Sequence, residues 1–271
     1  MSFFIVKPQE LAENFENYVI LDCRAELADH NWGKNEYLKE HIKSAHFVDG
    51  EGVLTGELGK HGGRHPFPDM EKFRKNMEDL GIRDDSKIAV YGLFAARAAF
   101  MLRLFGIKAG FISGDIKTLK NEGIPFNREI PEAQTGLISA NIDLSLLTSM
   151  KNVRKNLDNR NRILIDSRSL ERYHGENEPV DPIAGSIPGA VNFFWKDIIR
   201  NDGTFLSENE LKEHFSIDPS KEIILYCGSG VTACFNWLAL KQIGANCSMY
   251  AGSWSDWISF EDNLDLISSG E

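Results

Sequence analysis

Cysteine is scarce in this sequence, and its few copies are widely spaced. A zinc site or a dithiol redox motif needs closer pairs, and no Cys-x-x-Cys occurs. So few cysteines also exclude a disulfide-rich secreted fold, and we expect free thiols in a reducing, cytoplasmic location. The chain has 271 residues and only four cysteines: Cys23, Cys227, Cys234 and Cys247.

Long apolar runs and an excess of positive charge are also missing. No run approaches the roughly 20 apolar residues that cross a bilayer. The opening MSFFIVKPQEL has neither the basic region nor the cleavage site of a secretory leader. The formal net charge of −10 argues against nucleic acid or an anionic membrane as a partner. An anionic substrate would therefore need a local cluster of positive charge.

The chain does contain enough apolar residues for a core, and it contains an internal repeat. Apolar residues make up 42% and charged residues 26%. YVILDCR (18–24) matches RILIDSR (162–168), and KIAVYG (87–92) matches EIILYCG (222–228). After each second run comes an apolar segment of helical length. Because the matches keep the same order in both halves, we infer two homologous domains.

Each half alternates short β-rich runs with helical patterns, which is typical of an α/β fold with a mostly parallel sheet flanked by helices. The runs VILD, IAVY, ILID and IILY are nearly all apolar, as strands buried on both faces are. An amphipathic helix is expected from near Asp69 to near Gly81. We predict a first domain over 1–127, a polar linker over 128–141 and a second domain over 142–271.

The stretch CGSGVT (227–232) places a thiol directly after a predicted strand. Ligands of open parallel sheets bind beyond the carboxyl ends of the strands. Gly228 and Gly230 allow a tight curl, and a helix beginning near Thr232 would point its N-terminus at the sulfur. Cys227 is therefore a candidate nucleophile, with a passive core cysteine as the alternative. The matching turn in the first half, YGLFAAR, has no cysteine, so the fold does not require one.

Six motifs in fixed order extend over nearly the whole chain. They are Asp22-x-Arg24, GGRHPFPD (62–69), Asp166-x-Arg168, RYHGENEPVDPIAGSIPGAVN (172–192), CGSGVT (227–232) and YAGSWSDW (250–257). Together these motifs resemble the tandem rhodanese-type sulfurtransferases. In that family the first domain lacks the cysteine and the second is catalytic. A six-residue loop without cations is similar to the 3-mercaptopyruvate type, whereas thiosulfate-preferring members carry cationic residues there.

The resemblance implies a two-step reaction. Cys227 takes a sulfur from 3-mercaptopyruvate as a persulfide, and a thiol, thioredoxin or cyanide then accepts it. Thiosulfate is the alternative donor, with the same persulfide mechanism. Neither a metal nor an organic cofactor is implied.

The resemblance also implies roles for the residues around Cys227. Arg172 would bind the donor's anionic group and Arg64 would add positive charge. A second arginine is usual about nine residues after Arg172 in mercaptopyruvate enzymes, but this region reads EPVD. Ser229, His65 and Glu51 could form a serine–histidine–acid relay, which would polarise a carbonyl or move a proton. The loop residues that would bind the donor are Gly228, Gly230, Val231 and Thr232.

Two other functions are disfavoured by single positions. A cysteine phosphatase needs Cys-x5-Arg, and the sixth residue after Cys227 is Ala233. A non-catalytic binding module would be expected to have lost Cys227. The Asp166/Arg168 pair has a counterpart in the half without the cysteine, so we assign it to folding.

Overall fold

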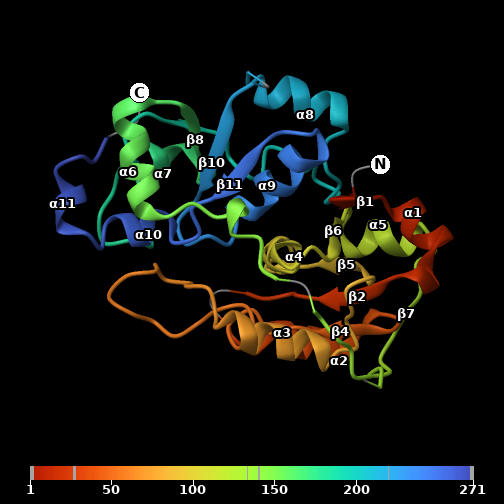
Figure 1. Ribbon diagram of the computed structural model, residues 1–271. Coiled ribbons are helices and arrows are strands. Elements are labelled where there is room, and N and C mark those ends of the chain that lie inside the picture. Colours follow the sequence, from red (N-terminus) through yellow and green to blue (C-terminus); the bar gives the residue numbers. More distant parts are fainter. Residues whose placement is uncertain (1–2, 27–28, 133, 140, 219, 269–271) are drawn as a thin grey trace. The chain divides into compact units, whose positions relative to one another are not determined.

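The computed structural model describes residues 3–26, 29–132, 134–139, 141–218 and 220–268 (Figure 1). The chain divides into two compact units. The first comprises 1–56, 67–144 and 199–205, and the second comprises 57–66, 145–198 and 206–271. The predicted domain boundaries stay a prediction, and residues 133 and 140 of the predicted linker lie outside the described ranges. Within those ranges, no helix is long and apolar enough to cross a membrane.

The first unit is built on a five-stranded sheet in the order β1-β6-β5-β2-β4. Every neighbouring pair in this sheet is parallel. The strands are β1 (Ile5–Val6), β2 (Val19–Asp22), β4 (Ala45–Phe47), β5 (Lys87–Tyr91) and β6 (Lys108–Ile112). A separate antiparallel pair joins β3 (His41–Ile42) to β7 (Phe126–Asn127).

Helices connect the strands of the first unit. The helix α4 packs on β5 and β6, and all its residues except Arg103 are buried. The predicted helix at 69–81 is α3: Asp69 caps it by accepting hydrogen bonds from two backbone N–H groups, and Gly81 follows its end with a φ of 83°. The helices are α1 (Pro8–Glu13), η1 (Phe15–Asn17), α2 (Trp32–Lys39), α3 (Met70–Glu78), α4 (Ala95–Leu104) and α5 (Ile116–Asn121).

The second unit has a four-stranded, fully parallel sheet in the order β11-β10-β8-β9. Its helix α9 packs on β10 and β11. The strands are β8 (Arg162–Asp166), β9 (Ala190–Asn192), β10 (Glu222–Tyr226) and β11 (Cys247–Met249). The helices are η2 (Leu144–Leu146), α6 (Met150–Asn159), α7 (Leu170–Tyr173), α8 (Glu208–Phe215), α9 (Ala233–Gln242), α10 (Ser253–Trp257) and α11 (Glu261–Leu264).

The two sheets repeat one topology, which confirms the predicted duplication. The order β6-β5-β2-β4 in one corresponds to β11-β10-β8-β9 in the other. The register agrees as well: Asp22 lies opposite Tyr91, and Asp166 lies opposite Tyr226. The apolar runs are buried as expected, because Ile223 to Tyr226 of β10 lie in a strand with neighbours on both sides.

An aspartate–arginine pair closes the same strand in both units. Arg24 Nη2 lies 2.6 Å from Asp22 Oδ2, and Arg168 Nη2 lies 2.6 Å from Asp166 Oδ2. Each arginine also donates to a backbone carbonyl, that of Glu40 or of Gly185 respectively. The aspartate–arginine pair has the same geometry in both units, although only the second unit has the candidate nucleophile Cys227. This agreement indicates a structural role for the pair.

The first unit has no room for a cysteine at the end of β5. Gly92 follows Tyr91 as Cys227 follows Tyr226, and its φ is 107°. A Cβ there would lie 2.4 Å from the backbone nitrogen of Arg24. Such a contact excludes any side chain without a backbone shift, so the two copies differ in backbone as well as in residue type.

Candidate active site

Cys227 lies where β10 ends and the loop to α9 begins, as the sequence predicts. The loop runs to Thr232, and α9 starts at Ala233, the position where a phosphatase would have arginine. Cys227 has only 1% of its surface exposed. A buried thiol at the carboxyl end of a central parallel strand is in the usual ligand-binding region of such sheets.

The loop backbone wraps the sulfur. The N–H of Gly230 donates to Cys227 Sγ at 3.2 Å, and such a donor interacts more favourably with a thiolate than with a thiol. The φ of Gly230 is 75°, and a Cβ there would lie 2.1 Å from the carbonyl oxygen of Ala251. The curl predicted for the Gly-Ser-Gly sequence is therefore real, and it depends on glycine at position 230.

The start of α10 fixes this loop from the other side. The N–H of Trp254 donates to the Cys227 carbonyl at 3.0 Å, and that of Ser255 donates to the Gly228 carbonyl at 2.9 Å. Ser253 Oγ accepts from the N–H of Cys227 at 3.1 Å. Cys227 is thus held by a second segment about 25 residues along the chain, which leaves its backbone little freedom to move.

A loop from the first half of the sequence, residues 57–66, belongs to the second unit. The N–H of Gly62 donates to Asp256 Oδ1 at 2.6 Å, and the N–H of Arg64 donates to Ser255 Oγ at 3.0 Å. The ring of His61 stacks on Phe260 with centroids 3.9 Å apart. Because α10 also holds the Cys227 loop, this attachment brings Arg64 and His65 to that loop.

Two of the three predicted relay residues meet. His65 Nδ1 and Ser229 Oγ lie 2.7 Å apart, at hydrogen-bond distance. Glu51 lies in the first unit, where it is exposed and its N–H donates to Asp49 Oδ1 at 3.0 Å. The histidine–serine contact is therefore present, and the part of Glu51 stays a prediction.

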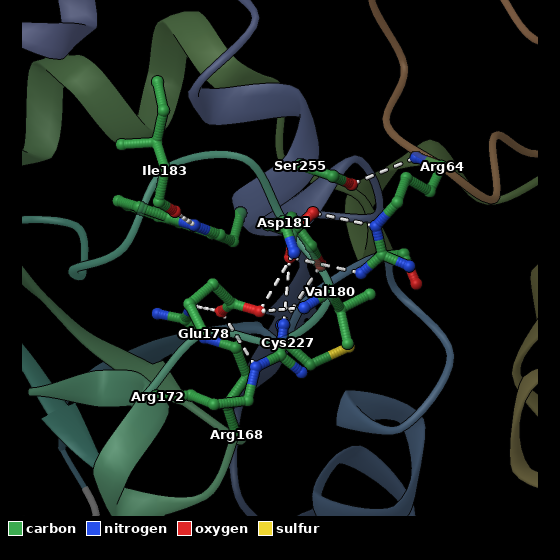
Figure 2. A network of polar contacts seen from close by, with 12 residues as sticks. Arg64, Arg168, Arg172, Glu178, Val180, Asp181, Ile183, Cys227 and Ser255 are labelled. Carbon is green, nitrogen blue, oxygen red and sulfur yellow. Dashed lines mark hydrogen bonds and ion pairs between the residues drawn. The ribbon is translucent and has the colours of Figure 1, made fainter. Parts of the chain in front are cut away.

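Two arginines meet above the loop beside Cys227. Arg172 comes from α7 and Arg64 from the attached loop (Figure 2). A Cβ placed on Gly228 would lie 2.9 Å from Nη2 of Arg64 and 3.2 Å from Nη2 of Arg172. Glycine at 228 therefore leaves the space into which both guanidinium groups reach. We call Arg64 and Arg172 the guanidinium pair.

Sequence reasoning missed the two acids that hold this pair. Asp181 accepts from both Arg64 and Arg172, and Glu178 accepts from Nε of Arg172 at 2.9 Å. Both acids lie in EPVD (178–181), the stretch in which the second arginine of mercaptopyruvate enzymes is missing. The two carboxylates in this stretch could have indicated an ion-pair cluster, because buried carboxylates need cationic or N–H partners.

Glu178 is the more heavily bonded of the two. Besides Arg172 it accepts from Nη1 of Arg168 at 3.2 Å and from the backbone N–H groups of Val180 and Asp181, both at 3.0 Å. Burial would raise the pKa of Glu178, but the hydrogen bonds from Arg172 and the two N–H groups outweigh it. The pKa therefore lies below its ordinary value of 4.5.

The charges of this cluster balance, which differs from the expected excess of positive charge. Three arginines at 64, 168 and 172 face three acids at 166, 178 and 181. Exposure is uneven, however. The side chains of Arg64 and Arg172 are 33% and 20% exposed, whereas those of Asp181 and Glu178 are 0% and 3% exposed. An approaching anion therefore meets the cations first.

The remaining predicted loop residues, Val231 and Thr232, lead into α9. Val231 is 6% exposed, and Thr232 is the N-cap residue of α9 without a side-chain capping hydrogen bond. Within the described part of the chain, no group of three or more His, Cys, Asp or Glu side chains has the arrangement of a metal site.

Comparison with known proteins gives one family. The model of the rhodanese-like domain matches twice, at residues 7–122 and 149–260. The chain is 36% identical over 269 residues to a protein of Pseudomonas aeruginosa named as a probable 3-mercaptopyruvate sulfurtransferase, covering 94% of this chain and 95% of that one. It is 30% identical over 252 residues to the thiosulfate sulfurtransferase of Mus musculus, covering 88% and 84%.

Two solved structures of sulfurtransferases are similar to this chain. The crystal structure of SseA from Escherichia coli, described as a 3-mercaptopyruvate sulfotransferase, superposes with a TM-score of 0.81 at 29% identity, covering 94% of this chain and all of that one. The 3-mercaptopyruvate sulfurtransferase from Leishmania major gives a TM-score of 0.85 at 25% identity, covering 97% and 76%. The chain therefore belongs to the rhodanese-like family, with two copies of its domain, and is an enzyme of the sulfurtransferase class.

Proposed function

We propose that this enzyme moves sulfur from 3-mercaptopyruvate to a thiol or cyanide through a persulfide on Cys227. The observation that carries the proposal is the surroundings of Cys227. Its sulfur accepts a backbone N–H bond from Gly230, and the guanidinium pair reaches over the adjacent Gly228. A nucleophilic sulfur next to two cations suits a donor that presents its sulfur and a carboxylate together.

The reaction would proceed in two transfers. The Cys227 thiolate attacks the donor sulfur and forms an S–S bond, while the sulfur–carbon bond breaks and its electron pair passes to carbon. The resulting enolate of pyruvate takes a proton. An acceptor thiolate or cyanide then attacks the outer sulfur of the persulfide and releases the Cys227 thiolate.

We assign the surrounding residues to three tasks. The guanidinium pair binds the carboxylate of the donor. Ser229 and His65, in contact at 2.7 Å, act at the donor's carbonyl oxygen, where negative charge develops as the sulfur leaves. Glu51 is assigned to orient His65. The residues assigned to line the donor site are Gly228, Gly230, Val231 and Thr232.

Thiosulfate is the second candidate donor. Its transfer releases sulfite from the same attack by Cys227, so the persulfide step is common to both. The loop CGSGVT has no cation, and the cluster of three arginines and three acids is formally neutral. Both observations favour a donor with a single negative charge over a dianion.

The acceptor and the location complete the proposal. We propose a small thiol or thioredoxin as acceptor, with cyanide as a substitute. All four cysteines are free thiols, which supports a reducing, cytoplasmic location. The net charge of −10 supports a small-molecule donor over nucleic acid or a membrane surface.

Steady-state kinetics with both donors tests the choice of donor. We expect kcat/KM to be higher with 3-mercaptopyruvate than with thiosulfate, because the site offers a dianion little net positive charge. Cyanide serves as a common acceptor, so the two rates are compared in one assay. A clear preference for thiosulfate would overturn the proposed donor and leave the thiosulfate reaction as the function.

A further inference from the structure

Asp181 joins the two arginines of the guanidinium pair. Its Oδ1 accepts from Nε of Arg64 at 2.8 Å, and its Oδ2 accepts from Nη2 of Arg64 at 3.2 Å and from Nη2 of Arg172 at 2.9 Å. Figure 2 shows the carboxylate between the two guanidinium groups, with Cys227 close by. The two arginines come from segments more than 100 residues apart, so this one carboxylate sets their spacing.

The same carboxylate lowers the charge that the pair offers to a ligand. The guanidinium pair and Asp181 together carry +1, whereas Arg168, Asp166 and Glu178 together carry −1, so the whole cluster is neutral. The Asp181 side chain is 0% exposed, so water screens its charge poorly. The Nη1 atoms of Arg64 and Arg172 have no hydrogen-bond partner among the described residues and remain available to a ligand.

A donor meets the partly exposed guanidinium pair and Asp181, which together carry +1, while the charge of Glu178 is shared between Arg168 and Arg172. A donor with a single carboxylate is matched by the pair, with its second charge offset by Asp181. The second negative charge of a dianion has no further cation to bind, because the loop from Cys227 to Thr232 contains none. It also lies near a poorly screened carboxylate, and repulsion in that setting falls off slowly with distance.

We propose, on the basis of the proposed sulfurtransferase function, that Asp181 is a specificity-determining residue. It holds Arg64 and Arg172 as one binding pair and sets the net charge of that pair to favour monoanionic carboxylate donors over dianionic ones. The alternative is that Asp181 only positions the arginines. In that case its neutralisation weakens binding of both donors equally, whereas a charge effect changes their ratio.

The test measures the ratio of kcat/KM for thiosulfate to kcat/KM for 3-mercaptopyruvate. Asp181→Asn keeps the shape and removes the charge, and we expect the ratio to rise about tenfold. The control is Glu176→Gln, which removes one charge from an exposed residue of the same segment and should leave the ratio unchanged. An unchanged ratio in Asp181→Asn, with both efficiencies lowered equally, overturns the proposal.

A second pair of variants measures the effect of the Asp181 charge when Asp181 holds only Arg172. Arg64→Gln removes one cation from a partly exposed site and should lower the ratio. Adding Asp181→Asn to it restores a net charge of +1, and should raise the ratio again by about tenfold. If the double variant keeps the ratio of Arg64→Gln, the charge of Asp181 does not determine specificity.

Unreactive probes separate this proposal from the proposed function. Calorimetry gives the affinities of the full chain for pyruvate, a monoanion, and for sulfate, a dianion. In Asp181→Asn the affinity for sulfate relative to pyruvate should rise about tenfold. Absence of turnover with both donors would overturn the proposed function, whereas an unchanged relative affinity would overturn the role of Asp181.

Discussion

At the scale of single residues, the site is defined by what its charged groups are bonded to. Cys227 has an N–H donor at its sulfur, and each arginine near it has an acidic partner. The acids are buried while the arginines of the guanidinium pair are partly exposed. This arrangement keeps two cations in place without an excess of charge that would repel them from each other.

The pH dependence of stability should reveal Glu178. Its folded-state pKa is lowered, so its carboxylate stabilises the fold above the ordinary pKa of 4.5, and this contribution is lost as the pH falls through the lowered value. We expect Glu178→Gln to reduce the free energy of unfolding by about 3 kcal/mol near neutral pH. The difference in unfolding free energy between the variant and the wild type should shrink as the pH falls below the ordinary value of 4.5, because the protonated carboxyl resembles the amide.

Urea unfolding at two pH values measures this difference. Tryptophan fluorescence reports mainly on the second unit, because four of the five tryptophans, at 195, 237, 254 and 257, lie there. Glu176→Gln is the control and should match the wild type at both pH values. A difference for Glu178→Gln that grows on acidification would contradict the lowered pKa.

At the scale of elements, the start of α10 organises the site. Its backbone N–H groups hold the carbonyls of Cys227 and Gly228, and its side chains at 255 and 256 hold the loop 57–66. One short helix thus positions Cys227 together with Arg64 and His65. The loop after β10 is pressed against the turn before this helix, where a Cβ on Gly230 would meet Ala251.

Gly230→Ala should therefore lower kcat more than alanine does at another glycine with a positive φ. The Cβ would lie 2.1 Å from the Ala251 carbonyl, so the loop must shift and the N–H bond to Cys227 is lost. We expect kcat to fall roughly 100-fold, as on loss of a backbone-like donor at a reacting centre. Gly244→Ala is the matched control: its φ is 85°, but nothing lies within 4 Å of the added Cβ.

The control should cost about 1 kcal/mol of stability and leave kcat unchanged. Steady-state kinetics and thermal unfolding of both variants make the comparison. Equal losses of kcat in the two variants would show that strain in the backbone, and not the contact with the turn, limits activity.

At the scale of the whole molecule, one topology appears twice, and Gly92 after β5 stands where Cys227 stands after β10. The repeat was predictable because buried parallel strands such as β8 and β10 leave unmistakable apolar runs, and Cys227 stood out against its counterpart Gly92. The membership of loop 57–66 in the second unit was not predictable, because hydrogen bonds between distant segments, such as that from Gly62 to Asp256, leave no local pattern.

The pairing of Asp181 and Glu178 with the arginines was not predictable from the sequence either. Asp181 and Glu178 read as ordinary acids in a polar stretch, and nothing in their spacing names Arg64 as a partner. Their burial emerges only when α7 and the following loop fold over the carboxyl end of the sheet. Local sequence predicts elements well, whereas the pairing of charges depends on the completed fold.

Cys227 is proposed to carry the sulfur, and the mass of the intact protein after exposure to 3-mercaptopyruvate shows whether it does. We predict that the wild type gains one sulfur atom, loses it to an added thiol, and that Cys227→Ser gains none. Cys247→Ser is the control and should still gain the sulfur, because burial raises the pKa of the Cys247 thiol to about 12 and keeps it unreactive. A Cys227→Ser variant that still gains sulfur, or a wild type that gains none, would show that Cys227 does not carry it.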